Sequence, residues 1–190
     1  MFSFDEVTLR PLEPEDIDTL YTWDCDHELN ILAGWSRRQG MAAFRQFQEQ
    51  RMMEPPENVE TFGIQVQGQL VGYVQLALID HQERRAAVGI LIGERAMWGR
   101  GIGSTALRIL LDYAFTVQGL ERIYAEIYSF NIRSAHLMEK VGFQREGMLR
   151  QHEIHNGARQ DMIIFGILKT EFYERVSSLF AIPGEETQAE

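Results

Sequence analysis

The sequence offers very little sulfur chemistry, because Cys25 is the single cysteine among its 190 residues. An internal disulfide and a metal site built from several cysteines are therefore excluded. The thiol is also a poor candidate for a nucleophile, since the carboxylates of its neighbours Asp24 and Asp26 disfavour the reactive thiolate. We expect Cys25 to be inert, and we predict no metal site.

Positive charge is scarce as well. The chain has 18 Lys and Arg residues against 28 Asp and Glu residues, which gives a formal net charge of −10 at pH 7. Such a surface repels phosphate backbones and anionic lipids, so neither nucleic acid nor a membrane is expected as a partner. Cationic partners, amines included, are favoured, although an acidic surface also serves simply to keep a protein soluble.

Long apolar runs, internal repeats and low-complexity tracts are absent too. The first six residues are acidic rather than basic, unlike a signal peptide, so we expect a cytoplasmic protein. Because 45% of the residues are hydrophobic, the chain is long enough to close one sizeable core. A single domain is expected over residues 1–182, followed by a frayed acidic tail over residues 183–190.

The apolar pattern predicts a mixture of strands and helices. A period of two predicts strands over residues 7–10, 61–66, 70–79, 86–92 and 122–128, and His155-Asn156-Gly157 predicts the type I′ turn of a closing hairpin. A period of 3.6 predicts helices from Pro14 toward Cys25 and over residues 41–52, 104–117, 132–141 and 169–180. The expected fold class is α/β, with a mixed, mostly antiparallel sheet of about seven strands flanked by helices.

The sharpest local feature is the run Trp98-Gly99-Arg100-Gly101-Ile102-Gly103-Ser104, between a predicted strand and a predicted helix. Glycines let the backbone approach a ligand closely, and the unpaired N–H groups that begin a helix attract anions. The run therefore suits a pyrophosphate. It is neither the phosphate loop of ATPases, since no Gly-Lys-Ser/Thr follows, nor the Gly-x-Gly-x-x-Gly fingerprint of dinucleotide-binding proteins.

Three ordered blocks resemble the GCN5-related N-acetyltransferases, the GNAT superfamily. Trp98-x-x-Gly101-x-Gly103 is similar to their pyrophosphate loop, Gln/Arg-x-x-Gly-x-Gly/Ala. Residues 131–143 are similar to the Asn-x-x-Ser…Glu-Lys-x-Gly-Phe signature of the Rim-type branch, which acetylates the N-termini of ribosomal proteins. Residues 152–157 are similar to the closing hairpin of Rim-type and spermidine acetyltransferases, and residues 7–12 to their opening strand. The resemblance implies a GNAT-like fold and acetyl-CoA as acetyl donor.

The resemblance also implies how acetyl-CoA is held. The strand at residues 90–92 should pair with the pantetheine arm, residues 100–105 should hold the pyrophosphate, and Asn131 should contact the pantetheine. The implied binding residues are Ile90, Leu91, Ile92, Trp98, Arg100, Gly101, Ile102, Gly103, Ser104, Thr105, Asn131 and Ser134. Four cations either neutralise the phosphates or are ordinary surface charges, namely Arg95, Arg100, Arg133 and Lys140.

Catalysis requires a neutral amine and a leaving thiolate that is stabilised or protonated. Many relatives use a tyrosine as the acid, but the matching position here is Met138, which cannot donate a proton. The resemblance leaves Ser134 near the sulfur, with capping of its helix as the alternative role. It implies Glu153 as the base, and Glu126 is a second candidate. His152 and His155, which flank Glu153 in the same predicted strand, are candidates to share the proton work.

The sequence indicates the acceptor amine less clearly than the acetyl donor. An α-amino group has a pKa near ~8 and a polyamine nitrogen near ~10.4, so the second costs roughly 3 kcal/mol more to deprotonate. Relatives that take spermidine carry extra carboxylates between their first two helices, where this chain has Arg37 and Arg38. We therefore favour the N-terminal α-amine of a protein or peptide, with a polyamine or aminoglycoside as the alternative. A homodimer is possible.

Two alternatives of another class stay open. The absence of the usual tyrosine at Met138 and of a glutamate in residues 86–89 is also what a non-catalytic acyl-CoA-binding module would show. An unrelated nucleotide-binding domain is a third interpretation, and it would bind ATP rather than acetyl-CoA.

Overall fold

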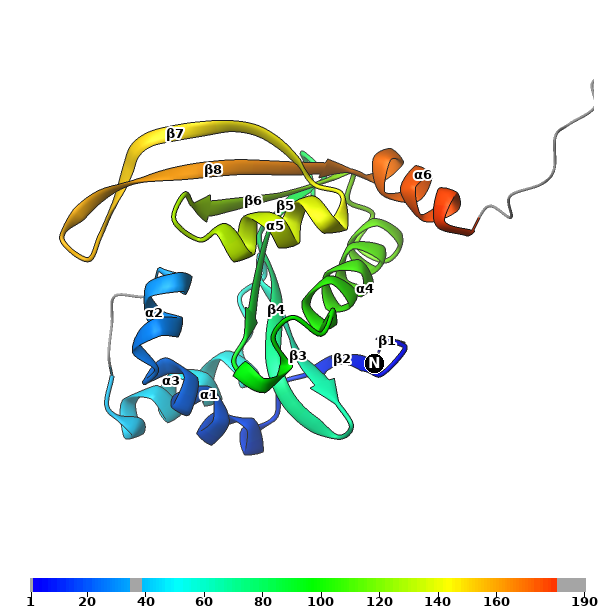
Figure 1. Ribbon diagram of the computed structural model, residues 1–190. Helices are drawn as coiled ribbons and strands as arrows, with labels where there is room; N and C mark the ends of the chain where they lie inside the picture. The colour runs from blue at the N-terminus through cyan, green and yellow to red at the C-terminus, as the bar shows by residue number, and fades with distance from the viewer. Residues whose placement is uncertain (1, 35–38, 181–190) are drawn as a thin grey trace, which may run out of the picture.

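The computed structural model describes residues 2–34 and 39–180 (Figure 1). The strands are β1 (Phe2–Phe4), β2 (Val7–Pro11), β3 (Glu60–Val66), β4 (Gln69–Asp80), β5 (Arg85–Ile92), β6 (Arg122–Tyr128), β7 (Gln144–His155) and β8 (Ala158–Leu168). The helices are α1 (Ile17–Asp24), α2 (His27–Ala33), α3 (Met41–Met53), α4 (Ile102–Thr116), α5 (Ile132–Val141) and α6 (Lys169–Phe180), with 3-10 turns η1 (Pro14–Asp16) and η2 (Arg95–Met97).

The strands form one eight-stranded sheet in the order β1-β2-β3-β4-β5-β6-β8-β7. Every neighbouring pair is antiparallel except β5 and β6, which are parallel and are joined through the crossover helix α4. The predicted mixed, mostly antiparallel sheet is therefore confirmed. It has one strand more than expected, because the three residues of β1 pair with β2 at the edge.

The sheet splits between its two parallel strands. β5 and β6 pair only from Arg85↔Arg122 to Ala87↔Tyr124. β5 continues for five residues along β4 as far as Ile92, and β6 continues along β8 as far as Tyr128. The two strands diverge beyond their paired ends, as Figure 1 shows. One edge of β5 is thereby left open next to β6.

The main core lies between the sheet and α4. The predicted apolar stripe of this helix is confirmed, since Leu107, Leu110, Leu111 and Ala114 are all 0% exposed. Burying a Leu side chain contributes about 1.5–3 kcal/mol, so this stripe fixes the helix against the strands. The helix begins two residues earlier than expected, because Gly101 takes a left-handed conformation (φ 84°) as its N-cap. This start places the glycine run at the open end of β5.

A second, smaller core gathers the N-terminal helices. Its buried members are Ile17, Leu20, Trp23, Leu29, Phe44 and Leu91. Helix α2 was not expected from the sequence. It begins at Asp26, whose side chain accepts hydrogen bonds from the N–H groups of Glu28 and Leu29, and it ends at Gly34, which is left-handed at φ 75°. No helix within the described residues is long and apolar enough to cross a bilayer.

Candidate active site

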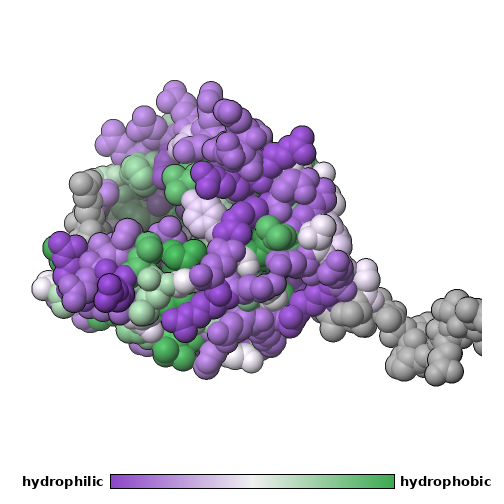
Figure 2. Space-filling view, turned by 90° about the horizontal axis from the view of Figure 1, so that it is seen from above, coloured by the Kyte–Doolittle hydropathy of each residue, from purple (hydrophilic) through white to green (hydrophobic). Residues whose placement is uncertain are grey.

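Three adjoining hollows run past the split in the sheet. The loop hollow, of about 290 Å³, is bounded by the glycine run, β5, α2 and α5. The central hollow, of about 400 Å³, lies between the diverging ends of β5 and β6. The outer hollow, of about 660 Å³, lies among α1, α3, β3 and β4. Figure 2 shows one face of the molecule, mostly hydrophilic, with a recess beside hydrophobic residues.

Neighbouring hollows share lining residues, so the three lie in a row, which we call the path. The loop and central hollows share Leu32, Ala33, Ile90, Leu91, Asn131 and Ser134. The central and outer hollows share Gly34, Tyr73 and Gln75. The central hollow therefore adjoins both of the others.

The glycine run supplies one wall of the loop hollow. Trp98, Gly101, Ile102, Gly103 and Ser104 all line it, as do the predicted strand residues Ile90, Leu91 and Ile92. Ser104 is buried and its hydroxyl donates to the carbonyl oxygen of Gly101 at 2.7 Å. Two predicted binding residues, Arg100 and Thr105, are not among the residues that line the hollow. Within this wall, Gly101, Gly103 and Ser104 leave the backbone at the start of α4 accessible, which suits an anion.

Helix α5 supplies two cations to the loop hollow, Arg133 and Lys140, and His136 lines it between them. The guanidinium carbon of Arg133 lies 3.9 Å from the ring centroid of Trp98, a cation–π contact across the mouth of the hollow. The indole N–H of Trp98 in turn donates to the carbonyl oxygen of Ile92 at 2.7 Å. Of the four cations considered from the sequence, the structure brings Arg133 and Lys140 to the hollow.

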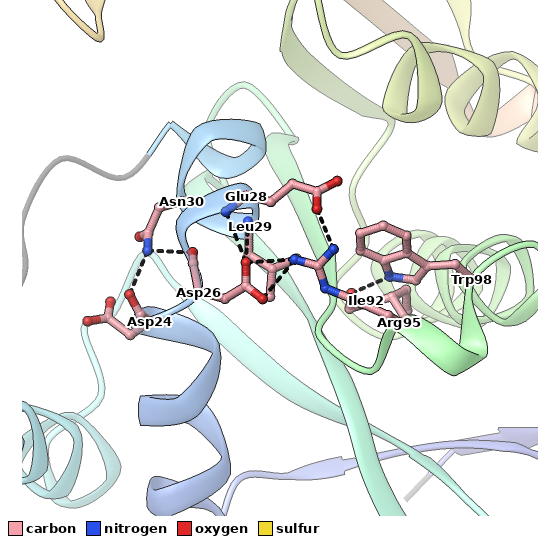
Figure 3. Close-up of polar contacts among 8 residues, drawn as sticks. All are labelled: Asp24, Asp26, Glu28, Leu29, Asn30, Ile92, Arg95 and Trp98. Carbon is pink, nitrogen blue, oxygen red and sulfur yellow. Dashed lines mark hydrogen bonds and ion pairs between the residues drawn. The ribbon is translucent and has the colours of Figure 1, made fainter.

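Arg95 instead clasps α2 (Figure 3). Its Nη2 lies 2.9 and 2.8 Å from the two carboxylate oxygens of Asp26, and its Nη1 contacts the carboxylate of Glu28. The hydrogen bond from Arg95, followed by one from the N–H of Leu29, lowers the pKa of Asp26 below its ordinary value. The clasp ties α2, which walls the loop hollow through Leu29 and Leu32, to the turn that precedes the glycine run.

Asn131 holds the other end of α2. Its Nδ2 donates to the carbonyl oxygen of Leu32 at 3.0 Å, and its Oδ1 accepts from the N–H of Ser134 at 3.1 Å. Asn131 thus caps α5, as the sequence predicts. Its amide also ties α5 to α2 across the path, so α2 contacts both margins of the split.

The central hollow contains the candidate catalytic groups. Glu153, Glu126 and Ser134 all line it, so the structure brings the three sequence candidates together. Met138 lines it as well and is otherwise buried. The histidines lie elsewhere, since neither His152 nor His155 belongs to the lining. This hollow can therefore accommodate a reaction that needs a carboxylate base beside a hydroxyl.

Tyr128 is a polar group of this hollow that the sequence did not single out. Its hydroxyl donates to Oε2 of Glu153 at 2.6 Å. Burial, together with the neighbouring Glu153, raises the pKa of Tyr128 to about 12, so the phenol keeps its proton at neutral pH. The available sequence signal was a tyrosine at the end of a predicted strand. The hydrogen-bond partner of this tyrosine, Glu153, comes from a hairpin that is distant in the sequence.

The outer hollow is mixed in character. Leu20, Phe44 and Met52 give it apolar walls, and Asp24 and Arg51 are the charged residues among its described lining. Across the central and outer hollows together, the described lining holds three carboxylates, those of Asp24, Glu126 and Glu153, against the single guanidinium of Arg51. The path beyond the split is therefore suited to a cation. Arg37 and Arg38, on which the sequence-based preference for a peptide depended, lie outside the described residues.

Comparison with known proteins identifies this arrangement. Residues 6–144 match the model of the acetyltransferase (GNAT) domain. The chain belongs to the GNAT acetyltransferase family. It is accordingly an acetyl-CoA-dependent N-acetyltransferase, and the resemblance drawn from the three sequence blocks is confirmed.

Relatives of this GNAT chain match it over nearly their full length. The spermidine N(1)-acetyltransferase of Vibrio cholerae is 30% identical over 172 residues, which cover 90% of this chain and 97% of that protein. The putative ribosomal N-acetyltransferase YdaF of Bacillus subtilis is 26% identical over 174 residues, covering 88% and 94%. The crystal structure of the Vibrio cholerae spermidine N-acetyltransferase in complex with CoA and spermine superimposes with a TM-score of 0.80 at 25% identity, covering 88% of this chain and 98% of that one.

Proposed function

We propose that this GNAT enzyme transfers the acetyl group of acetyl-CoA directly to a primary amine of a small, multiply charged cationic acceptor of the polyamine type. The observation that carries the proposal is the charge of the path beyond the split, with three carboxylates against one guanidinium in the described lining. Carboxylates attract an ammonium group and stabilise it before reaction. The similarity to spermidine acetyltransferases supports the same acceptor class.

The proposed donor side is the loop hollow. The N–H groups that open α4 face a pyrophosphate, with Arg133 and Lys140 offsetting its charge from α5. The open edge of β5 over residues 90–92 offers main-chain groups to the pantetheine arm. The thioester then reaches the central hollow, because the loop hollow and the central hollow share the wall at Asn131 and Ser134.

The proposed reaction is a single displacement in the central hollow. The acceptor nitrogen forms a bond to the acetyl carbon, and the carbon–sulfur bond of the thioester breaks. Glu153 takes the proton that the amine must lose, directly or through one water. The hydroxyl of Ser134 stabilises the leaving thiolate. The thiolate takes up the second proton that the nitrogen loses on forming the amide, and it ends as the free thiol of CoA. Ser134 is available for this because Asn131 provides the side-chain cap of its helix.

A protein N-terminus is the second candidate acceptor. It is favoured by Arg51 in the outer hollow, which can pair with an acidic side chain or carboxylate of a peptide. The similarity to the putative ribosomal acetyltransferase YdaF points the same way. An α-amine also asks less of the base, because its pKa near ~8 leaves more of it neutral at pH 7.

An acceptor panel at saturating acetyl-CoA tests the proposal. It contains spermidine, spermine, an aminoglycoside, peptides with free N-termini and the same peptides blocked at the N-terminus. We expect kcat/KM for the polyamines to exceed that for the peptides at least tenfold, which is about 1.4 kcal/mol of transition-state binding. The opposite order would establish the second candidate. Tight acetyl-CoA binding without any transfer would instead indicate a non-catalytic binding module.

A further inference from the structure

The hydrogen bond between Tyr128 and Glu153 crosses a strand. Tyr128 ends β6 and Glu153 lies near the end of β7, while β8 runs between them in the sheet. Since β6 and β7 are not neighbours, no shared ladder of main-chain hydrogen bonds fixes one against the other. The side-chain bond of 2.6 Å therefore ties them directly.

Glu153 owes its direction to an irregularity in β7. Leu149 pairs with Met162 and Glu153 with Gln160, so three residues of β7 lie opposite the single residue Asp161. Gln151 takes a positive φ of 52° in this bulge, and its N–H donates to Oδ1 of Asp161 at 2.7 Å. Bulges re-aim side chains at functional sites. The side chain of Glu153 is exposed, so the bulge sets its direction without packing that would hold the carboxylate still.

Tyr128, in contrast, is held firmly. Its ring stacks on Phe130 (centroids 5.1 Å apart, 11° between planes) and on His155 (5.0 Å, 27°). Gly34 closes a further side, since a Cβ there would lie only 2.6 Å from Cε2 of the tyrosine. With 9% of the residue exposed, the phenol has little freedom to turn. A closely packed donor thus meets an exposed acceptor.

We propose that Tyr128 is a positioning residue that orients the carboxylate of Glu153 for proton transfer from the acceptor amine. Its hydroxyl occupies Oε2, which leaves Oε1 for the amine or the water that relays its proton. Holding the base in one orientation raises the fraction of encounters with productive geometry. This inference rests on the proposed function, in which Glu153 is the base.

The role is tested by a double-mutant cycle of Tyr128→Phe and Glu153→Gln. The phenylalanine keeps the ring in its stack and removes only the hydroxyl. We expect Tyr128→Phe to lower kcat about tenfold, with the acceptor KM and the acetyl-CoA Kd within about twofold of the wild-type values. In the Glu153→Gln background the same change should lower kcat by no more than about twofold, because the two residues act as one unit.

Tyr173→Phe is the matched control, because the hydroxyl of Tyr173 donates to the carboxylate of Asp112 at 3.0 Å, between α6 and α4 and outside the three hollows. It should keep wild-type kcat. Wild-type kcat for Tyr128→Phe, or losses from the two substitutions that simply multiply, would overturn the positioning role. A wild-type protein that acetylates no amine removes the proposed function and this inference together, whereas an active Glu153→Gln variant removes the base role specifically. Melting temperatures on the same preparations show that each variant is folded.

Discussion

At the scale of single residues, the central hollow offers two carboxylates and distinguishes them by their surroundings. Glu126 lies within β6, opposite Ile164 of β8, and no side-chain donor to it is seen among the described residues. Glu153 receives the phenol of Tyr128. A base that must hold one orientation while it removes a proton benefits from such a donor, so we assign the proton transfer to Glu153.

This assignment predicts how the rate depends on pH in Glu153→Gln, which keeps the shape and removes the basicity. We expect kcat to fall roughly 10²-fold at pH 7, the usual contribution of a general base. The deficit should shrink to about tenfold or less near pH 9, because more of the free amine is then neutral. Rates of acetyl transfer between pH 6 and pH 9 measure it.

Glu126→Gln serves as the comparison and should keep most of its kcat, because the carboxylate that it removes is proposed to attract the acceptor and not to take its proton. A deficit in Glu153→Gln that stays constant across the pH range would point to a structural glutamate. Wild-type turnover at pH 7 would remove Glu153 from the mechanism and move attention to Glu126.

The residues of the site were predictable where a local pattern carries them. Ser134, Asn131 and the glycines belong to sequence blocks with fixed spacing, and the structure brings them to the hollows. Tyr128 was not foreseen, because its role depends on a bulge in another strand and on a contact across β8. Such a contact is set by tertiary packing, which local periodicity does not report.

At the scale of elements, the start of α4 forms one wall of the loop hollow, where we propose that the donor binds. A Cβ at Gly103 would lie 3.4 Å from Leu137 and 3.6 Å from Ile90, which are ordinary contacts. The backbone of Gly103 has no positive φ that would demand glycine. A side chain there is therefore compatible with the fold, and its main effect falls on the loop hollow.

Gly103→Asp should weaken acetyl-CoA binding at least tenfold, because it places a negative charge where the pyrophosphate is proposed to bind. Gly103→Ala should weaken it much less, since it adds a methyl group without charge. Calorimetric titration of both variants, with melting temperatures close to that of the wild type, measures the difference. Equal affinity for Asp and Ala variants would mean that the phosphates lie elsewhere.

Helix α2 gives a second prediction at this scale. Arg95→Gln removes the clasp on Asp26 and Glu28 and loosens the wall formed by Leu29 and Leu32. Because these charges are exposed, the melting temperature should change little, while the acetyl-CoA Kd should rise about three- to tenfold. The difference from wild type should narrow at high salt, which screens the pair. Arg84→Gln, which removes an exposed ion pair with Glu121, should leave the Kd unchanged.

The elements that the sequence did not reveal are the short ones. α2 has seven residues and β1 has three, too few for a clear period. The caps of α2 were readable, since Asp26 precedes it and Gly34 follows it. The long elements, such as α4 with its apolar stripe, were correctly located because their burial repeats over several turns.

At the scale of the whole molecule, the N-terminal helices are anchored to the sheet by a partly buried ion pair. Arg10 of β2 donates to the carboxylate of Asp16 at 2.6 and 2.8 Å, and the N–H of Glu13 adds a third bond at 2.8 Å. Burial acts to raise the pKa of Asp16, but the hydrogen bonds from Arg10 and Glu13 outweigh it and lower the pKa below its ordinary value.

The lowered pKa makes stability depend on pH. A carboxyl group whose pKa is depressed by folding adds stability above its unfolded pKa and loses it as the pH falls through the folded value. Asp16→Asn should therefore be less stable than wild type by about 1.5–3 kcal/mol at pH 7, and the gap should narrow toward about pH 3. Urea unfolding at several pH values measures it. Asp18→Asn, which removes the exposed ion pair with Arg45, should lower the free energy of unfolding by about 1 kcal/mol or less. A stability difference between wild type and Asp16→Asn that does not change with pH would contradict the role of the Asp16 charge.

The split in the sheet has a consequence for the exchange of amide hydrogens. Among the described residues, only three pairs join β5 to β6, and no strand of that part of the chain covers the amides of residues 88–92 that point away from β4. A pantetheine arm lying against this edge supplies acceptors that a neighbouring strand would otherwise provide. These amides should therefore exchange rapidly with solvent deuterium in the free protein and slowly once CoA is added. Bound CoA would then take the place of a neighbouring strand along β5, and the edge would be unpaired again after each release.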